Sequence, residues 1–177
     1  MRDYISLANL LTTGNLAAGF FALVLVSRSG MLIATLLVLA AAIFDALDGK
    51  LARERLDADT FGASLDSLAD LVSFGAVPAF ALYLVGLEAV PVLGIVACLL
   101  FLVCGAWRLA RFSAVKSDGV FLGLPIPPAG IAAMLLVLAV AGGAPPMLAA
   151  AGAIALAALM VSSLRVPTLA GLRRRAD

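Results

Sequence analysis

Apolar residues run along the chain in long blocks, separated by short polar connections that contain turn-forming residues. Most blocks approach the roughly 20 apolar residues that a helix needs to cross the hydrocarbon core of a membrane. The pattern predicts an all-α, polytopic membrane protein with six transmembrane helices. The expected helices cover Leu7 to Val26, Met31 to Arg53, Thr60 to Leu84, Val90 to Ser113, Pro127 to Ala141 and Met147 to Leu164.

Composition supports this reading and narrows the chemistry. Hydrophobic residues make up 64% of the chain and charged residues 13%, whereas soluble domains average roughly half apolar and a quarter charged. We expect one domain, residues 1–177, with membrane lipid as its surroundings. The net charge of +1 gives no reason to expect a nucleic acid partner. The absence of histidine removes His-based catalysis and most zinc chemistry, which leaves carboxylates as the candidate chemical groups.

Positive residues predict the orientation, because Lys and Arg are retained in cytoplasmic loops. With both termini in the cytoplasm, only Arg28 of the twelve Lys and Arg residues falls on the outer side. We therefore expect a prokaryotic cytoplasmic membrane protein whose acidic segment, Asp45 to Asp70, faces the cytoplasm. The residues expected on the inner side are Arg2, Lys50, Arg53, Arg55, Arg108, Arg111, Lys116, Arg165, Arg173, Arg174 and Arg175.

Four aspartates lie within or beside two consecutive predicted spans. Asp45 and Asp48 are three residues apart on one helix, and Asp66 and Asp70 are four apart on the next, so each pair shares a helix face. The short connection between the helices brings the two faces together. Charged groups in a membrane are costly and mark functional sites. Two divalent cations would balance the four charges, and carboxylate oxygens select Mg²⁺, Mn²⁺ or Ca²⁺.

Small residues and an arginine accompany the carboxylates. Gly49, Ala52 and Gly62 leave room for a flat or extended ligand, although such residues also serve close helix packing. Arg53 beside this gap is suited to binding phosphate oxygens. Together with bound metal, this arrangement indicates diphosphate chemistry in which one carboxylate takes a proton from an attacking hydroxyl.

The pattern D-x2-D-G-x2-A-R-x8-G-x3-D-x3-D, which begins at Asp45 and ends at Asp70, resembles the signature of CDP-alcohol phosphotransferases. The resemblance covers essentially the whole chain and implies transfer of a phosphatidyl group from a CDP-linked lipid to a hydroxyl acceptor, with release of CMP and formation of a homodimer. By position it assigns metal ligation to Asp45, Asp48, Asp66 and Asp70, proton removal to Asp70 as well, and CDP binding to Gly49, Ala52, Arg53 and Gly62.

The segment ANLLTTGN resembles the Asn-x-x-Thr segment that opens the first span in this family. Asn9 and Thr12 lie one helical turn apart, and both side chains are suited to hydrogen bonding with phosphate or ribose. For Asn9, a simple role in starting the helix is an equal alternative.

Two later segments, WRLARFS at Trp107 to Ser113 and FLGLPIPPAG at Phe121 to Gly130, resemble those of phosphatidylserine synthases within the family. They imply CDP-diacylglycerol and L-serine as substrates. Arg108 and Arg111 would then bind a serine carboxylate or a lipid phosphate, or else only anchor the helix at the inner membrane surface. A glycerol-phosphate or inositol-phosphate acceptor is the alternative within the family. A divalent-metal transporter is the alternative outside it, which the lack of further acidic residues along the later spans disfavours.

Overall fold

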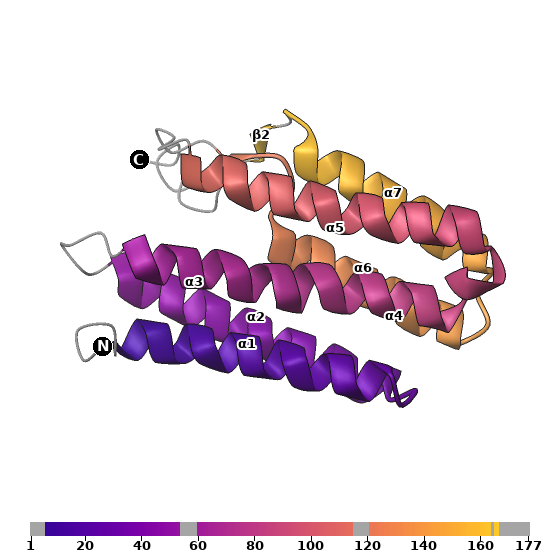
Figure 1. Cartoon of the computed structure of the whole chain (residues 1–177), viewed down its shortest axis with the longest axis horizontal. Coiled ribbons are helices and arrows are strands. Elements are labelled where there is room, and N and C mark those ends of the chain that lie inside the picture. Colours follow the sequence, from indigo (N-terminus) through magenta and orange to yellow (C-terminus); the bar gives the residue numbers. More distant parts are fainter. Residues whose placement is uncertain (1–5, 54–59, 115–120, 164, 167–177) are drawn as a thin grey trace, which may run out of the picture.

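The computed structural model describes residues 6–53, 60–114, 121–163 and 165–166. Its helices lie side by side along a common direction and form an elongated bundle (Figure 1). The start of α1, the end of α2, the start of α3 and the end of α5 lie at the same end of the bundle, on the left in Figure 1. In chain order the elements are α1 (Leu7–Val26), α2 (Met31–Arg53), α3 (Thr60–Asp70), η2 (Leu71–Ala76), α4 (Val77–Val85), η3 (Leu87–Ala89), α5 (Pro91–Ala114), β1 (Phe121–Leu122), α6 (Ile126–Ala141), α7 (Pro146–Val161) and β2 (Arg165–Val166).

Among the residues that the structure describes, four stretches of helix are long and apolar enough to cross a membrane. They are in α1, α2 and α5, and in the continuous helical run Thr60–Val85 that comprises α3, η2 and α4. α6 and α7 have 16 residues each, or about 24 Å of helix, which is shorter than the roughly 30 Å hydrocarbon core. Four of the six predicted spans therefore meet this criterion, and membrane crossing by α6 and α7 stays a prediction.

The outer surface of the bundle is rich in exposed apolar side chains, of which Val92 and Trp107 are among the most exposed. The interior contains large side chains such as Phe74, Phe101 and Met134, packed among many alanines. Small residues allow helices to approach closely where lipid supplies no hydrophobic driving force for their association. The long apolar helices and this apolar exterior make the chain an integral membrane protein.

The sequence predicts a uniform α-helix for the third span. The structure instead contains a π-helical turn, η2, directly after Asp70. Pro78, in the first turn of α4, has no N–H to donate to the carbonyl of Phe74 four residues earlier. The regular hydrogen-bond ladder is interrupted there, and a π-turn is one of the ways in which a helix accommodates such a change.

Two glycines from neighbouring helices pack against this turn. A Cβ atom on Gly130 of α6 would lie 2.8 Å from the Cα atom of Phe74. A Cβ atom on Gly19 of α1 would overlap the hydroxyl of Ser73. The turn is therefore held between α1 and α6, immediately next to the acidic part of α3.

The connection that leads into α6 contains a short strand pairing that the sequence does not predict. β1 pairs with β2 in antiparallel orientation. Gly123 follows β1 with a φ angle of 79°, in the left-handed region that favours glycine. Pro125 precedes the first residue of α6 with extended backbone. The fold is thus all-α among the described elements apart from this pair, and the connection itself explains part of the Gly and Pro content of this segment.

Candidate active site

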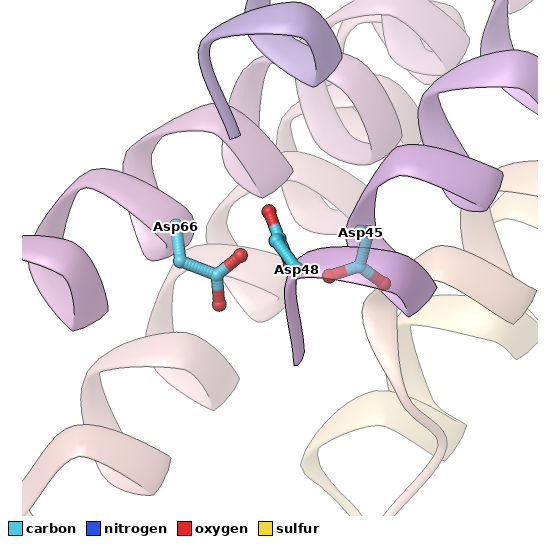
Figure 2. A group of neighbouring side chains, drawn as sticks. All are labelled: Asp45, Asp48 and Asp66. Carbon is cyan, nitrogen blue, oxygen red and sulfur yellow. The ribbon is translucent and has the colours of Figure 1, made fainter. Parts of the chain in front are cut away.

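Three of the four predicted aspartates meet between α2 and α3. One carboxylate oxygen from each of Asp45, Asp48 and Asp66 lies within 4.8 Å of the other two. Figure 2 shows Asp66 on one side, Asp45 on the other and Asp48 between them in this view. The helix spacing places Asp45 and Asp48 on one face of α2, and the antiparallel return of α3 brings Asp66 opposite them. The convergence predicted from the spacing is found in the structure.

The donor set of these three residues fits a divalent cation. Asp48 is buried, and Asp45 and Asp66 are half-buried. The Oδ1 atom of Asp66 is buried without a hydrogen-bond partner, which is costly for a carboxylate unless a cation or donor satisfies it. Hard carboxylate oxygens this close together are ligands that Mg²⁺, Mn²⁺ or Ca²⁺ accepts. The cluster can therefore hold a metal ion.

Asp48 is held by the first helix. The Oγ1 atom of Thr12 lies 2.6 Å from Oδ2 of Asp48 and 3.1 Å from the backbone carbonyl of Ala8. The hydroxyl has one proton, and the shorter contact with a carboxylate is the stronger one. Thr12, predicted to contact phosphate or ribose, thus orients a predicted metal ligand in this structure.

Asn9 is buried in the first turn of α1, one turn before Thr12. Its backbone N–H donates to Oγ of Ser6, which is the N-cap residue of the helix. The side chain that caps α1 is therefore that of Ser6, so starting the helix does not require the side-chain amide of Asn9.

Asp70 lies one turn beyond Asp66 on α3 and is buried. It is not one of the three clustered carboxylates, although it interacts electrostatically with Asp45 and Asp66. Its Oδ1 atom accepts a hydrogen bond of 3.1 Å from Nδ2 of Asn15 in α1. Asn15 is not among the site residues predicted from the sequence. Its signal was an amide in the middle of an apolar span, three residues after Thr12 on the same helix side.

The structure describes the surroundings of the small motif residues to different extents. Among the described residues, a Cβ atom added to Gly49 would meet no neighbouring atom within 4 Å, so packing against these residues does not require glycine there. The space beside Gly49 is open, as a ligand site needs. Gly62 is half-buried in the first turn of α3. Ala52 and Arg53 end α2, and their side chains lie outside the described ones.

The two arginines of α5 have different surroundings. Arg108 is half-buried, its Nε atom is buried without a hydrogen-bond partner, and its guanidinium interacts electrostatically with Asp70 and Asp45. Arg111 is exposed in the last turn of α5. Of the two predicted acceptor-binding residues, the structure brings Arg108 to the acidic site and leaves Arg111 at the surface.

The fold and the site define an integral membrane protein with a helical bundle, in which clustered carboxylates from two adjacent helices can hold a metal ion. Residues 5–164 match the CDP-alcohol phosphatidyltransferase family. The chain belongs to this family, in agreement with the resemblance of its aspartate motif, and is a phosphatidyltransferase.

Sequence similarity to several phosphatidyltransferases and a related synthase extends over most of the chain. The chain is 35% identical over 173 residues to the archaetidylserine synthase of Methanothermobacter thermautotrophicus, covering 96% of this chain and 73% of that protein. It is 34% identical over 159 residues to the CDP-diacylglycerol–serine O-phosphatidyltransferase of Bacillus subtilis, covering 89% and 88%. The CDP-diacylglycerol–serine O-phosphatidyltransferase of Mycobacterium bovis is 42% identical to the chain over 142 residues, which cover 75% of this chain and 49% of that protein.

Proposed function

We propose that this protein transfers a phosphatidyl group from CDP-diacylglycerol to L-serine and releases CMP. The observation that carries the chemistry is the convergence of Asp45, Asp48 and Asp66 from two helices. The serine acceptor is supported by the names of the relatives, which include serine O-phosphatidyltransferases in Bacillus subtilis and Mycobacterium bovis. The half-buried Arg108 beside the acidic site agrees with an acceptor that has a carboxylate.

Asp45, Asp48 and Asp66 would be the main ligands of two divalent cations, Mg²⁺, Mn²⁺ or Ca²⁺. Asp70, which the resemblance also names as a ligand, lies outside this cluster and would act in proton removal instead. When bound, these cations would neutralise the diphosphate and the departing CMP. The protein contributes the ligand geometry, since Thr12 holds Asp48 by a hydrogen bond of 2.6 Å. Hydrogen bonds of this kind to a metal ligand fix its orientation and support affinity for the metal.

Asp70 is the proposed general base. It lies apart from the three clustered carboxylates and is held by Asn15, so one of its oxygens is left to take a proton. In the proposed step, Asp70 removes the proton of the serine hydroxyl, and the oxygen attacks the phosphorus nearer the diacylglycerol. A new P–O bond forms to serine, the P–O bond to CMP breaks, and CMP leaves with the electron pair.

The CDP moiety would occupy the open space beside Gly49, with Ala52, Arg53 and Gly62 as further contacts and Asn9 and Thr12 near its phosphates or ribose. The support for this placement is that an added Cβ atom at Gly49 meets no atom of the described residues within 4 Å. A glycine in the interior of a helix lowers stability, so its presence without a packing reason favours a ligand at this place.

Replacing Gly49 with alanine is expected to affect stability and binding in opposite directions. Alanine should stabilise the helix by about 0.5–1 kcal/mol, while its methyl group enters the proposed CDP space and raises KM for CDP-diacylglycerol about tenfold, as expected for mild overpacking. Steady-state kinetics and thermal unfolding in detergent measure both effects.

Gly14→Ala is the matched control for this change. Gly14 is also inside a helix, and an added Cβ atom would meet the ring of Phe44 at 3.8 Å, an ordinary contact. We expect stabilisation without a change in KM. A normal KM for Gly49→Ala would remove Gly49 from the CDP site.

Arg108 is the proposed contact for the carboxylate of serine, and Arg111 the surface anchor. The serine hydroxyl must approach Asp70 to lose its proton, and Arg108 interacts electrostatically with Asp70. Its buried Nε atom has no partner, so a bound carboxylate would supply one. Hydrogen bonds between a guanidinium and a carboxylate add geometric specificity to the attraction between their charges.

Arg108→Gln is expected to raise KM for serine about 10- to 100-fold, because a hydrogen bond to a charged group contributes about 1.5–3 kcal/mol. KM for CDP-diacylglycerol should stay near the wild-type value. Arg111→Gln, at the exposed position on the same helix, serves as the control and should change neither. Equal effects of the two substitutions would assign Arg108 to anchoring instead.

The proposed site faces the cytoplasm in a prokaryotic membrane. Lys50, Arg108 and Arg111 belong to helix segments at the acidic end of the bundle, whereas Arg28 follows the opposite end of α1. Positive residues are retained on the cytoplasmic side. With α6 and α7 as spans, six crossings would place both termini there. The homodimer that the family resemblance implies stays a prediction.

The proposed function is tested with purified protein, CDP-diacylglycerol and Mn²⁺, offered in turn serine, glycerol phosphate and inositol phosphate. We expect CMP release with serine alone. Release with a phosphorylated acceptor and none with serine would replace the acceptor while keeping the family chemistry. If the folded protein binds metal but releases CMP with none of the three acceptors, the proposed transfer is contradicted.

A further inference from the structure

A buried side-chain amide of α1 lies beside the proposed general base, Asp70. Asn15 of α1 has no exposed surface. Its Nδ2 atom lies 3.1 Å from Oδ1 of Asp70, across the interface between α1 and α3. A hydrogen bond between residues 55 positions apart in sequence reflects the tertiary arrangement of two spans.

The chemistry of the pair determines how the amide is oriented. An ionised carboxylate can only accept, so the NH₂ group of Asn15 must face Asp70. The Oδ1 atom of Asn15 is then left buried without a hydrogen-bond partner. An unsatisfied buried oxygen lowers stability, so an amide at this position is not explained by folding alone.

The geometry points to Asn15 as the residue that positions the carboxylate of Asp70 for proton removal from the acceptor hydroxyl. This inference rests on the role proposed above for Asp70. With Oδ1 held by the amide, Oδ2 is the oxygen left to take the proton. A hydrogen bond to one oxygen also fixes the rotation of the carboxylate, which otherwise turns freely about its terminal bond.

Contact between α1 and the third span does not depend on this amide. The hydroxyl of Ser73, in the π-turn, donates to the backbone carbonyl of Asn15 at 3.1 Å. Gly19 packs against the same serine. Ser73 therefore provides a control, because it bonds to the backbone of Asn15 and not to the carboxylate of Asp70.

The test compares Asn15→Ala, Asn15→Val and Ser73→Ala in detergent or nanodiscs, with serine as the acceptor. Both Asn15 variants lack the donor, and valine fills more of the space than alanine. We expect kcat to fall about 10- to 100-fold in both, as for a misplaced catalytic group, with KM for CDP-diacylglycerol and Mn²⁺ affinity unchanged. Ser73→Ala should keep the wild-type kcat, and the thermal midpoints of the Asn15 variants should fall no further than that of Ser73→Ala.

A wild-type kcat in both Asn15 variants would overturn the positioning role while leaving the proposed function intact. The role is also overturned if kcat falls only together with Mn²⁺ affinity and thermal stability, because that outcome indicates a structural contribution. Wild-type protein that releases no CMP with serine would instead refute the proposed function, on which the inference depends.

Discussion

Asp70→Asn is expected to lower kcat for CMP release by about 10²- to 10⁴-fold, the usual contribution of general base catalysis. The substitution keeps the shape of the side chain and an oxygen that can accept from Asn15, but it removes the group that takes the proton. Binding of CDP-diacylglycerol should be largely retained, because Asp70 lies apart from the three clustered carboxylates. Steady-state turnover and equilibrium binding of the CDP-lipid measure the two quantities separately.

A control for this variant is Thr35→Val. Thr35 is a buried polar residue of α2 whose hydroxyl donates to the backbone carbonyl of Met31, within its own helix. We expect nearly normal turnover from it. Wild-type turnover in Asp70→Asn would exclude Asp70 as the base, and loss of CDP-lipid binding together with turnover would assign it to ligand binding instead.

Asp66→Asn is expected to weaken Mn²⁺ binding and, at fixed low Mn²⁺, to lower activity by about 100-fold or more. Residues that only orient a metal ligand commonly contribute 10- to 100-fold to metal affinity, and Asp66 is itself one of the three converging carboxylates. Its buried and unpartnered Oδ1 atom is the group that a cation would satisfy. Titration of Mn²⁺ by electron paramagnetic resonance measures the affinity directly.

Excess Mn²⁺ distinguishes this variant from Asp70→Asn. High Mn²⁺ should restore part of the activity of Asp66→Asn, since the defect is in binding, and should not rescue a missing base. Glu88→Gln is the control, because Glu88 is an exposed acidic residue of η3. Unchanged Mn²⁺ affinity in Asp66→Asn would remove this carboxylate from the metal site.

The long helices and the carboxylate convergence could be predicted from the sequence. α1 and α2 begin and end at the predicted residues, because a long apolar run and its polar boundaries define a membrane helix with little help from tertiary contacts. Asp45, Asp48 and Asp66 converge because helix periodicity assigns each to a face and the short connection makes the helices antiparallel neighbours.

Other features depend on contacts between distant segments. The role of Asn15 follows from its contact with Asp70, and a single polar residue in an apolar span does not identify its partner. Arg108 and Arg111 have equivalent sequence signals, and only the packing of α5 separates them. The π-turn had a local signal in Pro78, but its location at Leu71–Ala76 also reflects packing by Gly19 and Gly130.

The central claim is that metal held by the acidic hairpin supports transfer of a phosphatidyl group to serine. The most direct measurement follows CMP and serine-labelled lipid in the same reaction, with metal-depleted protein to which Mn²⁺ is then added. We expect neither product before the addition, and equal molar amounts of both after it. Full activity without metal, or CMP released without labelled lipid, would contradict the claim.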